Sequence, residues 1–310
     1  MAAPTTSLTL EQIQKIGRRD RTIRTVNRYL FVIPALVMFF VFTILPLLIG
    51  TFYSLTDYNM IQDWHFVGLN NYKTLFLDDD IFLIALQNTL IYAICTGPTG
   101  FLMAFGFAWI ITNLKGKKFF TLCFYTPTLA SGVMMSTIWM FFFANDNKGL
   151  FNYYLLKWHL ITEPILWTQN VSTIMPVIIF ISLMMSMGNS FLVFLAGLQN
   201  IPKDYYEAAQ IDGVKNKFQE MAYITWPQMK PQLLFGAVNA IVGAFGVFDI
   251  AVTIGGLPSP EYAAHTWVAH LYDYAFIRFQ MGYASAISFL LAVTTFTLGR
   301  ICMRVFKEKD

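Results

Sequence analysis

Charged residues are scarce in this chain. They make up 13% of its 310 positions, against 56% for hydrophobic residues, whereas a soluble domain carries about 25% charged residues. The apolar residues gather into runs of about twenty, the length with which a helix crosses the hydrocarbon core of a bilayer. The composition therefore excludes an ordinary soluble protein and predicts an all-α membrane protein.

Cysteine pairs are also missing. The three cysteines, Cys95, Cys123 and Cys302, all fall within apolar runs, and none belongs to a CxxC motif. Buried cysteines of this kind behave as small hydrophobic residues. We therefore predict reduced packing residues and neither a disulfide nor a cysteine metal site.

The sequence carries no signature of catalysis. It contains no GxxxxGK[ST] run to cradle the phosphates of ATP, no HExxH and no GxSxG. All four histidines are predicted in outer loops, and His265 and His270 are five residues apart, which is poor spacing for a shared metal on one helix face. We predict no catalytic residue, no metal site and no cofactor bound by this chain, so it is not expected to be an enzyme.

Six apolar runs are long enough to be membrane spans. No small-residue cleavage site follows the first run, so we predict a retained span and not a removed signal peptide. The second run is longer than an untilted crossing needs, and its ends are expected to project into water. The predicted spans are Tyr29–Leu55, Ile81–Thr112, Phe119–Phe143, Asn170–Leu198, Gln232–Ile254 and Met281–Met303.

Lysine and arginine are distributed unevenly between the spans. Seventeen of the 21 fall in the N-terminal segment, the turn after the second span, the loop after the fourth span and the C-terminal tail, and four fall in the other three loops. The positive-inside rule therefore places both termini in the cytoplasm. We predict a cytoplasmic segment at residues 1–28, a six-helix membrane domain at 29–304 and a cytoplasmic tail at 305–310.

The cytoplasmic stretch between the fourth and fifth spans, Ile201–Pro231, carries ordered helix signals and is here named the 201–231 loop. Asn200 is a possible N-cap, Pro202 suits the first turn, and Gly213 is well placed to end the helix in a left-handed conformation. The predicted apolar side of this helix consists of Tyr205, Ala208, Ala209 and Ile211.

A second short helix is predicted in the same loop. It can start near Asn216, carry Phe218, Met221 and Ala222 on one face, and stop before Pro227. Two short helices joined by a tight turn at a membrane surface make a rigid projection. We expect a partner on that side of the membrane to grip it.

The same loop resembles a known family. Glu207-Ala208-Ala209, followed by Gly213, Ile224 and Pro227, resembles the EAA loop of permease subunits of binding-protein-dependent ABC importers. In that family the loop forms coupling helices that seat in a groove of the ATP-hydrolysing subunit. Glu207 offers a carboxylate that an arginine of the partner can hold at two points. The alternative is an ordinary amphipathic loop with a solvated Glu207. The residues assigned to ATPase coupling are Glu207, Ala208, Ala209, Asp212, Gly213 and Pro227.

The resemblance extends over nearly the whole chain. FVGLNNYKTLF before the second span, VFD at Val247–Asp249 and AFIRFQMGYASAISF at Ala275–Phe289 look like segments of carbohydrate-type permeases, the branch that includes the maltose and glycerol-3-phosphate permeases. The sequence departs from the family pattern at two places. Val214 stands where alanine is usual, and the turn after the fifth span reads IGGLPSP in place of TGGGP.

The resemblance implies a type I ABC importer permease fold of the MetI-like kind, half of a heterodimeric channel that crosses the bacterial cell membrane several times. The expected partners are a second homologous permease, two ATPase subunits that bind ATP-Mg, an extracytoplasmic solute-binding protein and membrane lipid, with no nucleic acid. Closure of the ATPases would drive alternating access through the 201–231 loop. The expected cargo is a mono- or oligosaccharide, with a glycerol-phosphate-like solute as the alternative.

Polar side chains within the spans are candidates for the substrate path. The candidates are Asn88, Asn189, Ser190, Asn239, Phe245 and Asp249. An asparagine or serine at such a place is at least as often a hydrogen-bonded helix contact, and a phenylalanine is more often simple packing. Asp249 is the only acidic residue within a span, so it should face protein or water. It leaves open an ion-coupled secondary transporter, although that class usually shows inverted repeats and interrupted helices.

Overall fold

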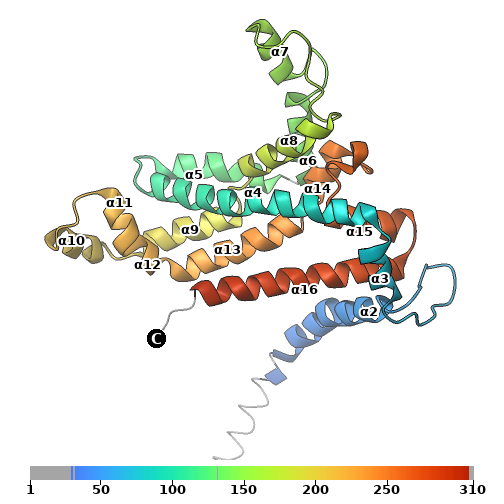
Figure 1. The fold of residues 1–310 in the computed structure, drawn as a ribbon. Coiled ribbons are helices and arrows are strands. Elements are labelled where there is room, and N and C mark those ends of the chain that lie inside the picture. Colours follow the sequence, from blue (N-terminus) through green and yellow to red (C-terminus); the bar gives the residue numbers. More distant parts are fainter. Residues whose placement is uncertain (1–28, 31, 131, 307–310) are drawn as a thin grey trace, which may run out of the picture. The chain divides into compact units, whose positions relative to one another are not determined.

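The computed structural model describes residues 29–30, 32–130 and 132–306. These residues are helical, with no strand among them and one isolated bridge between Thr56 and Phe66. The predicted segment 1–28 and most of the predicted tail lie outside the described residues. In chain order the helices are η1 (Phe40–Ile44), α2 (Leu45–Tyr53), α3 (Asn70–Leu77), α4 (Asp80–Thr112), α5 (Lys117–Tyr125), η2 (Thr126–Leu129), α6 (Gly132–Phe142), α7 (Leu150–Lys157), α8 (Val171–Met184), α9 (Asn189–Asn200), α10 (Lys203–Ile211), α11 (Lys217–Glu220), η3 (Met221–Thr225), α12 (Trp226–Gln228), α13 (Lys230–Phe245), α14 (Asp249–Gly255), η4 (Pro260–Tyr262), α15 (Trp267–Tyr272), η5 (Asp273–Ile277) and α16 (Met281–Phe306) (Figure 1).

The chain divides into two compact units, residues 1–52 and 53–310. The described part of the first unit is an apolar helix, which has a π-helical stretch at η1 and runs on into α2. The second unit contains α3 to α16. Every site discussed below lies within this second unit.

Five helical runs among the described residues are long and apolar enough to cross a membrane. They are Val32–Tyr53, Asp80–Thr112, Val171–Asn200, Lys230–Gly255 and Met281–Phe306. The predicted second and sixth spans are confirmed as the unbroken helices α4 and α16. Six crossings and the orientation of the two ends remain predictions.

The third predicted span, Phe119–Phe143, is not one helix. It is divided into α5, the 3₁₀ turn η2 and the short apolar helix α6. Pro127 lies in that turn and has no N–H to donate, and Ala130 is extended with ψ 150°. Because these breaking residues are surrounded by apolar ones, the hydrophobic run conceals the break.

The fourth and fifth predicted spans are also interrupted. The first break falls between α8 and α9, at residues 185–188, and the second between α13 and α14, at residues 246–248. A break inside an apolar bundle leaves backbone carbonyls that need donors. Ser186 donates its hydroxyl to the Leu183 carbonyl at 2.7 Å, and Thr266 donates to the Val247 carbonyl at 3.0 Å. Side-chain hydroxyls therefore satisfy carbonyls that the helices release.

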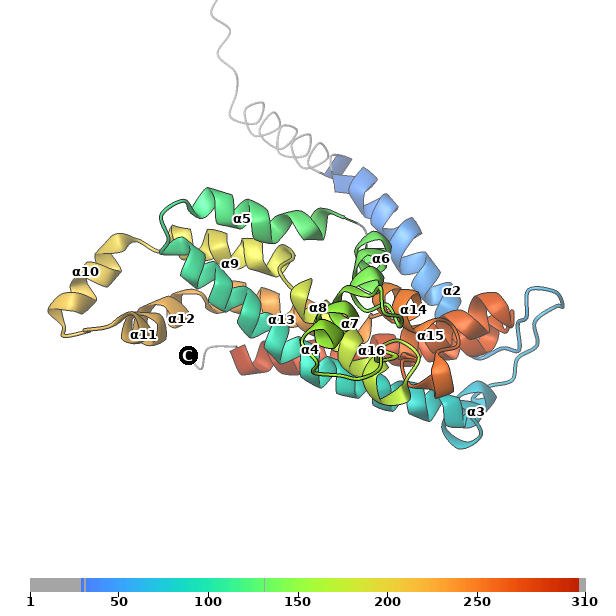
Figure 2. The same cartoon turned by 90° about the horizontal axis from the view of Figure 1, so that it is seen from above.

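Helix α4 is the central element of the second unit. It packs against α8, α9, α13 and α15, and α16 lies on α13 (Figure 2). Between α9 and α13 the approach is close, because a Cβ on Gly236 would overlap the Phe194 ring. The largest wholly buried side chains of this unit are Trp267, Phe82, Phe191, Phe194, Leu75, Ile111, Ile174, Ile178, Ile181, Met229, Leu233 and Ile287.

The second unit has two distinct ends. Helices α10, α11 and α12 lie at one end of α4, and α3 and α15 lie at the other (Figures 1 and 2). At the α15 end, the Gly282 N–H donates to the Tyr58 carbonyl at 2.8 Å. The Asn71 side chain donates there to the carbonyls of Ser54 and Thr56. These contacts connect the segment before α3 to the start of α16.

Candidate functional site

The 201–231 loop begins with α10, which starts two residues later than the predicted N-cap at Asn200 implies. Pro202 is the N-cap, with φ −58° and ψ 137°, and Asn200 is the last residue of α9, so neither holds the predicted position. The predicted end at Gly213 is confirmed. Gly213 has φ 97° and is followed by Val214, whose N–H donates back to the Ala209 carbonyl at 2.9 Å. This left-handed ending is the one that glycine adopts without steric cost.

The second helix of the loop begins as predicted and ends later. Asn216 is its N-cap, and its side chain accepts from the Gln219 N–H at 2.8 Å. The helix does not stop before Pro227 but continues through η3 into α12, which contains that proline. Proline leaves a carbonyl in the preceding turn without its usual donor, and the wide π turn of η3 adapts the helix to that position.

Two polar contacts hold the two helices of the loop together, and a third, within α11, pairs Lys217 with Glu220. The Tyr206 hydroxyl lies 3.0 Å from Thr225 Oγ1. Lys217 Nζ contacts Glu220 Oε2 at 2.7 Å, and Gln210 reaches the same carboxylate from α10. The face of α10 that packs within this chain is therefore polar, and it is not the predicted apolar side.

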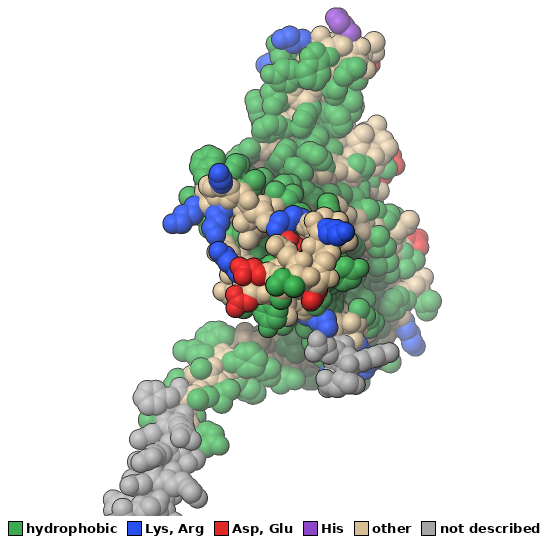
Figure 3. Space-filling model, turned by 90° about the vertical axis from the view of Figure 1, so that its left-hand side faces the viewer, with side chains coloured by type: hydrophobic (Ala, Val, Ile, Leu, Met, Phe, Trp, Pro, Cys, Tyr) green, Lys and Arg blue, Asp and Glu red, His purple; other side chains and the backbone are tan. Residues whose placement is uncertain are grey.

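The predicted apolar side of α10 points away from the chain. Ile211 is 87% exposed and Tyr205 50%, and Phe218 on the neighbouring helix is 70% exposed. Five of the predicted coupling residues are exposed, and Ala209 is half-buried. Figure 3 shows this end of the molecule, where acidic and basic side chains gather amid hydrophobic surface. The loop thus presents large apolar side chains and charges that have little to pack against within the second unit.

A polar cleft of about 610 Å³ lies under α10. It is bounded by the C-terminal ends of α4 and α9 and by α11. The side chains of Glu207 and Tyr206 line it together with three lysines, Lys117, Lys203 and Lys217. Glu207 therefore stands at the boundary between the exposed surface of α10 and a cleft with cationic side chains.

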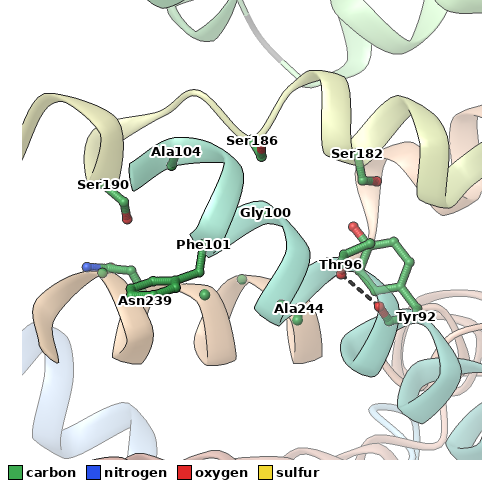
Figure 4. Close-up of a pocket in the computed structure, with 14 residues that line it drawn as sticks. Tyr92, Thr96, Gly100, Phe101, Ala104, Ser182, Ser186, Ser190, Asn239 and Ala244 are labelled. Carbon is green, nitrogen blue, oxygen red and sulfur yellow. Dashed lines mark hydrogen bonds between the residues drawn. The ribbon is translucent and has the colours of Figure 1, made fainter. Parts of the chain in front are cut away.

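A second cavity, of about 260 Å³, lies between α4, α13 and the interrupted pair α8 and α9 (Figure 4). Ser182 lies on α8, Ser186 in the break and Ser190 on α9. Across the cavity are Tyr92 and Thr96 of α4, and the Thr96 hydroxyl donates to the Tyr92 carbonyl at 2.7 Å. The break between α8 and α9 therefore opens on a cavity lined by hydroxyl groups, here named the serine cavity.

The chemistry of this cavity is polar and uncharged. The Ser182 and Ser186 hydroxyls donate to backbone carbonyls of their own segment, so their oxygens remain available as acceptors. The Asn239 amide nitrogen likewise donates to the Phe235 carbonyl at 2.9 Å. No charged side chain is among its lining residues, which are Tyr92, Thr96, Gly97, Gly100, Phe101, Ala104, Ser182, Ser186, Ser190, Gly236, Asn239, Ala240, Gly243 and Ala244.

Two of the six candidates for the substrate path, Ser190 and Asn239, line this cavity. Asn189 is exposed at the start of α9 and is not among the lining residues. Asn88 donates to the carbonyls of Tyr262 at 2.8 Å and His265 at 3.0 Å, so it fastens a loop at the α15 end. Phe245 is buried with Phe82, Trp267 and Tyr283 as a packing residue, and it also lines an apolar groove.

Asp249 is the first residue of α14, after the break in the fifth predicted span, and its side chain is exposed in this chain. A Cβ added to Gly132 would lie 3.0 Å from Asp249 Oδ2, so the carboxylate lies against the first turn of α6. The positive end of a helix dipole favours a carboxylate at such a place.

Most of the polar lining of this cavity was not predicted from the sequence. Tyr92 and Thr96 are four residues apart on α4, and Ser182, Ser186 and Ser190 recur every four residues. Polar residues at that spacing share one side of a helix, and this is the signal that could have identified them. Ala240, Gly243 and Ala244 of α13 also line the cavity.

The sequence matches the model of a known protein family over nearly its whole length. Residues 8–307 match the model described as "Binding-protein-dependent transport system inner membrane component". This chain belongs to that family. The match covers nearly the whole sequence, so the resemblance seen at the 201–231 loop and in the last third of the chain is confirmed.

Curated members of the permease family align with most of this chain. A probable ABC transporter permease protein of Bacillus subtilis, YesP, is 34% identical over 298 residues, which is 94% of either chain. The arabinooligosaccharides transport system permease protein AraP of the same organism is 32% identical over 284 residues, 89% of this chain and 87% of AraP. Both are permease subunits by name, as expected from the absence of catalytic motifs here.

A solved structure carries the same fold. A chain of a bacterial alginate ABC transporter, solved in complex with an alginate pentasaccharide-bound periplasmic protein, superposes with a TM-score of 0.79 and 20% identity. The superposition covers 93% of this chain and 98% of the other. The all-helical fold of this chain is therefore shared with a chain of that transporter.

Proposed function

We propose that this chain is a channel-forming subunit of an ATP-driven sugar importer, and that its 201–231 loop transmits closure of a partner ATPase to the membrane helices. The observation that carries the proposal is the surface of α10. Its polar side is fastened to η3 by Tyr206 and to α11 by Gln210, while Ile211, Tyr205 and Glu207 remain exposed. An exposed apolar face with adjacent charges is typical of a protein-binding surface.

The connection from the loop to the cavity is short. Helix α9 leads directly into α10, and α12 leads directly into α13. Ser190 on α9 and Asn239 on α13 line the same cavity. A displacement of the 201–231 loop therefore reaches both walls of the cavity through continuous chain. The breaks at residues 185–188 and 246–248 are the places where these helices can bend without disturbing α8 and α14.

The expected cargo follows from the cavity lining and from the relatives. Serine and threonine oxygens, an asparagine and the ring of Tyr92 suit an uncharged solute rich in hydroxyl groups. A sugar has these properties, and AraP is named for arabinooligosaccharides. A strongly anionic solute would find no cationic side chain in the lining. We therefore propose a neutral mono- or oligosaccharide.

The remaining partners follow from membership of the permease family. We propose a second homologous permease, which completes the channel, two ATPase subunits that carry ATP-Mg, and an extracytoplasmic solute-binding protein at the α15 end. The chain would lie in the bacterial cell membrane with six crossings and both termini in the cytoplasm. The 17 lysines and arginines on the predicted cytoplasmic segments support this orientation.

A secondary transporter is the second candidate because helices are interrupted here, as they are in that class. Asp249 would be its coupling residue. Its carboxylate lies against the start of α6 and is not in the lining of the serine cavity, so it has no contact with the proposed path. Uptake that followed a proton or sodium gradient, without ATP, would favour this candidate over the importer.

Substitution of Glu207 tests the coupling role. In purified membranes, Glu207→Arg should abolish ATP-dependent uptake and release the ATPase on affinity purification, because a positive charge would oppose an arginine of the partner. The protein should still insert, since Glu207 is exposed. Glu163→Arg, at an exposed site in the loop between α7 and α8, is the matched control and should leave uptake unchanged. Retained uptake in Glu207→Arg would remove this residue from the coupling role.

Filling the cavity tests the substrate path. Gly243 lines it and has no heavy atom within 4 Å of an added Cβ, so Gly243→Leu can occupy the space without an initial clash. Uptake should fall at least about tenfold while the ATPase still copurifies, because one misplaced or blocked contact is worth this much. Gly106→Leu on α4, equally open but outside the lining, is the control. Equal uptake by both variants would show that the path lies elsewhere.

A further inference from the structure

Two buried histidines form a chain with a buried carboxylate at the α15 end. His265 Nε2 lies 3.2 Å from His270 Nδ1, and His270 Nε2 lies 3.0 Å from Asp79 Oδ2. The Tyr283 hydroxyl donates to the same oxygen at 2.6 Å. Asp79, His265 and His270 are all buried. We name these four residues the histidine cluster.

The histidine cluster connects segments that are distant in sequence. Asp79 is the N-cap of α4 and accepts from the Phe82 N–H at 2.9 Å. His265 precedes α15, His270 lies in α15, and Tyr283 lies in the first turn of α16. Asn88 on α4 holds the carbonyls of Tyr262 and His265. The segment 259–280 is therefore fastened to α4 and α16 by these polar contacts and by the buried Trp267 ring, which packs against Phe82.

The hydrogen positions in the cluster follow from the carboxylate. Burial by itself raises the pKa of Asp79, but the hydrogen bonds from His270, Tyr283 and the Phe82 N–H outweigh it and hold that pKa well below its usual range. Ionised Asp79 can only accept, so His270 must donate from Nε2. In neutral His270, Nδ1 is then the acceptor for the His265 Nε2 hydrogen. His265 Nδ1 then carries no hydrogen, and it is buried without a hydrogen-bond partner.

One added proton cannot be accommodated in this arrangement. A proton on His265 Nδ1 creates a buried N–H with no acceptor. A proton on His270 Nδ1 faces the hydrogen of His265 Nε2, and His265 must then change tautomer and carry its hydrogen on Nδ1. Both routes end with an unpaired N–H at the same buried atom, and burying a donor without an acceptor is unfavourable.

The charges around His265 do not supply the missing acceptor. The ring of Tyr262 is packed edge-on against that of His265, 5.3 Å between centroids. Arg278 and Asp273 form an ion pair at 2.8 Å, and the Arg278 guanidinium lies over the Tyr274 ring. Burial and the nearby Asp79 charge raise the pKa of Tyr274, so it stays protonated in acid. The groups that face the pair from all packed elements are Asp79, Tyr262, Asp273, Tyr274, Arg278 and Tyr283.

We propose that the histidine cluster is a proton-sensitive latch, which holds the 259–280 segment on α4 and α16 while both histidines are neutral and releases it when one proton is taken up. In the released state His265 reaches water, where its protonated form is solvated. This inference rests on the cluster and not on the nature of the cargo, so it stands apart from the importer proposal.

The direction of the pH effect follows from His265. Burial, and then the neighbouring His270, lower the pKa of His265 from 6.5 to about 4 in the latched state. A histidine whose pKa is lowered in the latched state stabilises that state at a pH above 6.5, its ordinary pKa. This stabilisation is lost as the pH falls from 6.5 toward 4. Because each pKa unit is tenfold in the equilibrium, the ratio of latched to released protein should fall roughly thirtyfold by pH 5.

The first test uses the unmodified full chain in lipid nanodiscs. Exchange of the imidazole C2 hydrogen, followed by mass spectrometry, reports the titration of each histidine separately. His265 should titrate well below about 6.5, the ordinary histidine pKa. A His265 midpoint at or above that value would overturn the latch, since the buried atom would then tolerate the proton.

The second test asks whether the segment responds. Backbone hydrogen exchange should show protection of residues 259–280 falling roughly thirtyfold between pH 7.5 and pH 5, after correction for the intrinsic rate. His265→Gln keeps a donor toward His270 but does not titrate, so this fall should disappear. His159→Gln is the control and should behave like the unmodified chain. Unchanged protection in the unmodified chain, or an unchanged fall in His265→Gln, would overturn the proposal.

Discussion

The two ends of the second unit use polar residues in opposite ways. At the α15 end, Asp79, His265 and His270 are buried and bonded mainly to one another. At the α10 end, charged and apolar side chains are exposed together, and Ile211 is 87% exposed. One end therefore satisfies most of its buried polar groups, with His265 Nδ1 the exception. The other end leaves apolar surface that a partner can cover.

This difference separates stability from coupling. A buried network stabilises the chain that contains it, and removal of one member leaves the others without partners. An exposed side chain contributes little to folding and can be replaced at little cost. Substitutions at the α15 end should therefore change unfolding, and those at the α10 end should change partner binding. Substitutions at Gly282, Asp79 and Ile211 should show these two kinds of effect, with the loss of stability decreasing in that order.

The largest effect is expected at Gly282. A Cβ at this position would overlap the backbone carbonyl of Thr56, which cannot move as a flexible side chain can. Gly282→Val should destabilise the protein by more than about 3 kcal/mol, beyond the usual cost of overpacking, and full-length protein should aggregate on extraction. Gly299→Val on the same helix is the control, because nothing lies within 4 Å of its added Cβ. Similar yields of monodisperse protein from both variants would contradict the prediction.

A smaller effect is expected at Asp79. Asp79→Asn keeps an oxygen for the Phe82 N–H but loses the oxygen that accepts from both His270 and Tyr283, which should cost about 2 kcal/mol or more. Thermal unfolding in detergent, followed by size-exclusion chromatography, measures the change. The adjacent Asp78 is exposed, so Asp78→Asn should have no effect. If the two variants unfold at the same temperature, the histidine cluster contributes no stability.

The smallest effect on stability, and the largest on assembly, is expected at Ile211. Ile211→Ser should change the unfolding free energy by less than about 0.5 kcal/mol, as is usual for an exposed site. Recovery of the ATPase on affinity purification should nevertheless fall, because the apolar contact with the partner is lost. Leu160→Ser, at a residue that is 66% exposed after α7, should leave recovery unchanged. If Ile211→Ser lowered the unfolding free energy but left ATPase recovery normal, Ile211 would contribute to folding and not to partner binding.

Several features could be predicted from the sequence because local chemistry fixes them. The second and sixth spans follow from hydropathy, and α4 and α16 are found where they were expected. Gly213 ends α10 and Asn216 begins the next helix, since these residue types suit those backbone positions. The family resemblance rests on the same loop and is confirmed by the match over residues 8–307.

Other features were decided by tertiary packing. The breaks at residues 185–188 and 246–248 lie within apolar runs, where a hydropathy pattern gives no sign of them. Thr266 satisfies the carbonyl of Val247 from another segment, and this is possible only after the chain has folded. The apolar side of α10 was identified from periodicity, but the polar side proved to be the one that packs.

The sequence by itself determined that this chain is a helical membrane permease with a projecting 201–231 loop, because composition, caps and motifs act over short distances. Only the tertiary structure decided which polar residues meet. His270 and Asp79 are separated by 191 positions and Tyr283 and Asp79 by 204, and the serine cavity takes its walls from four helices. Contacts at such separations depend on how whole helices pack, and no local pattern encodes that.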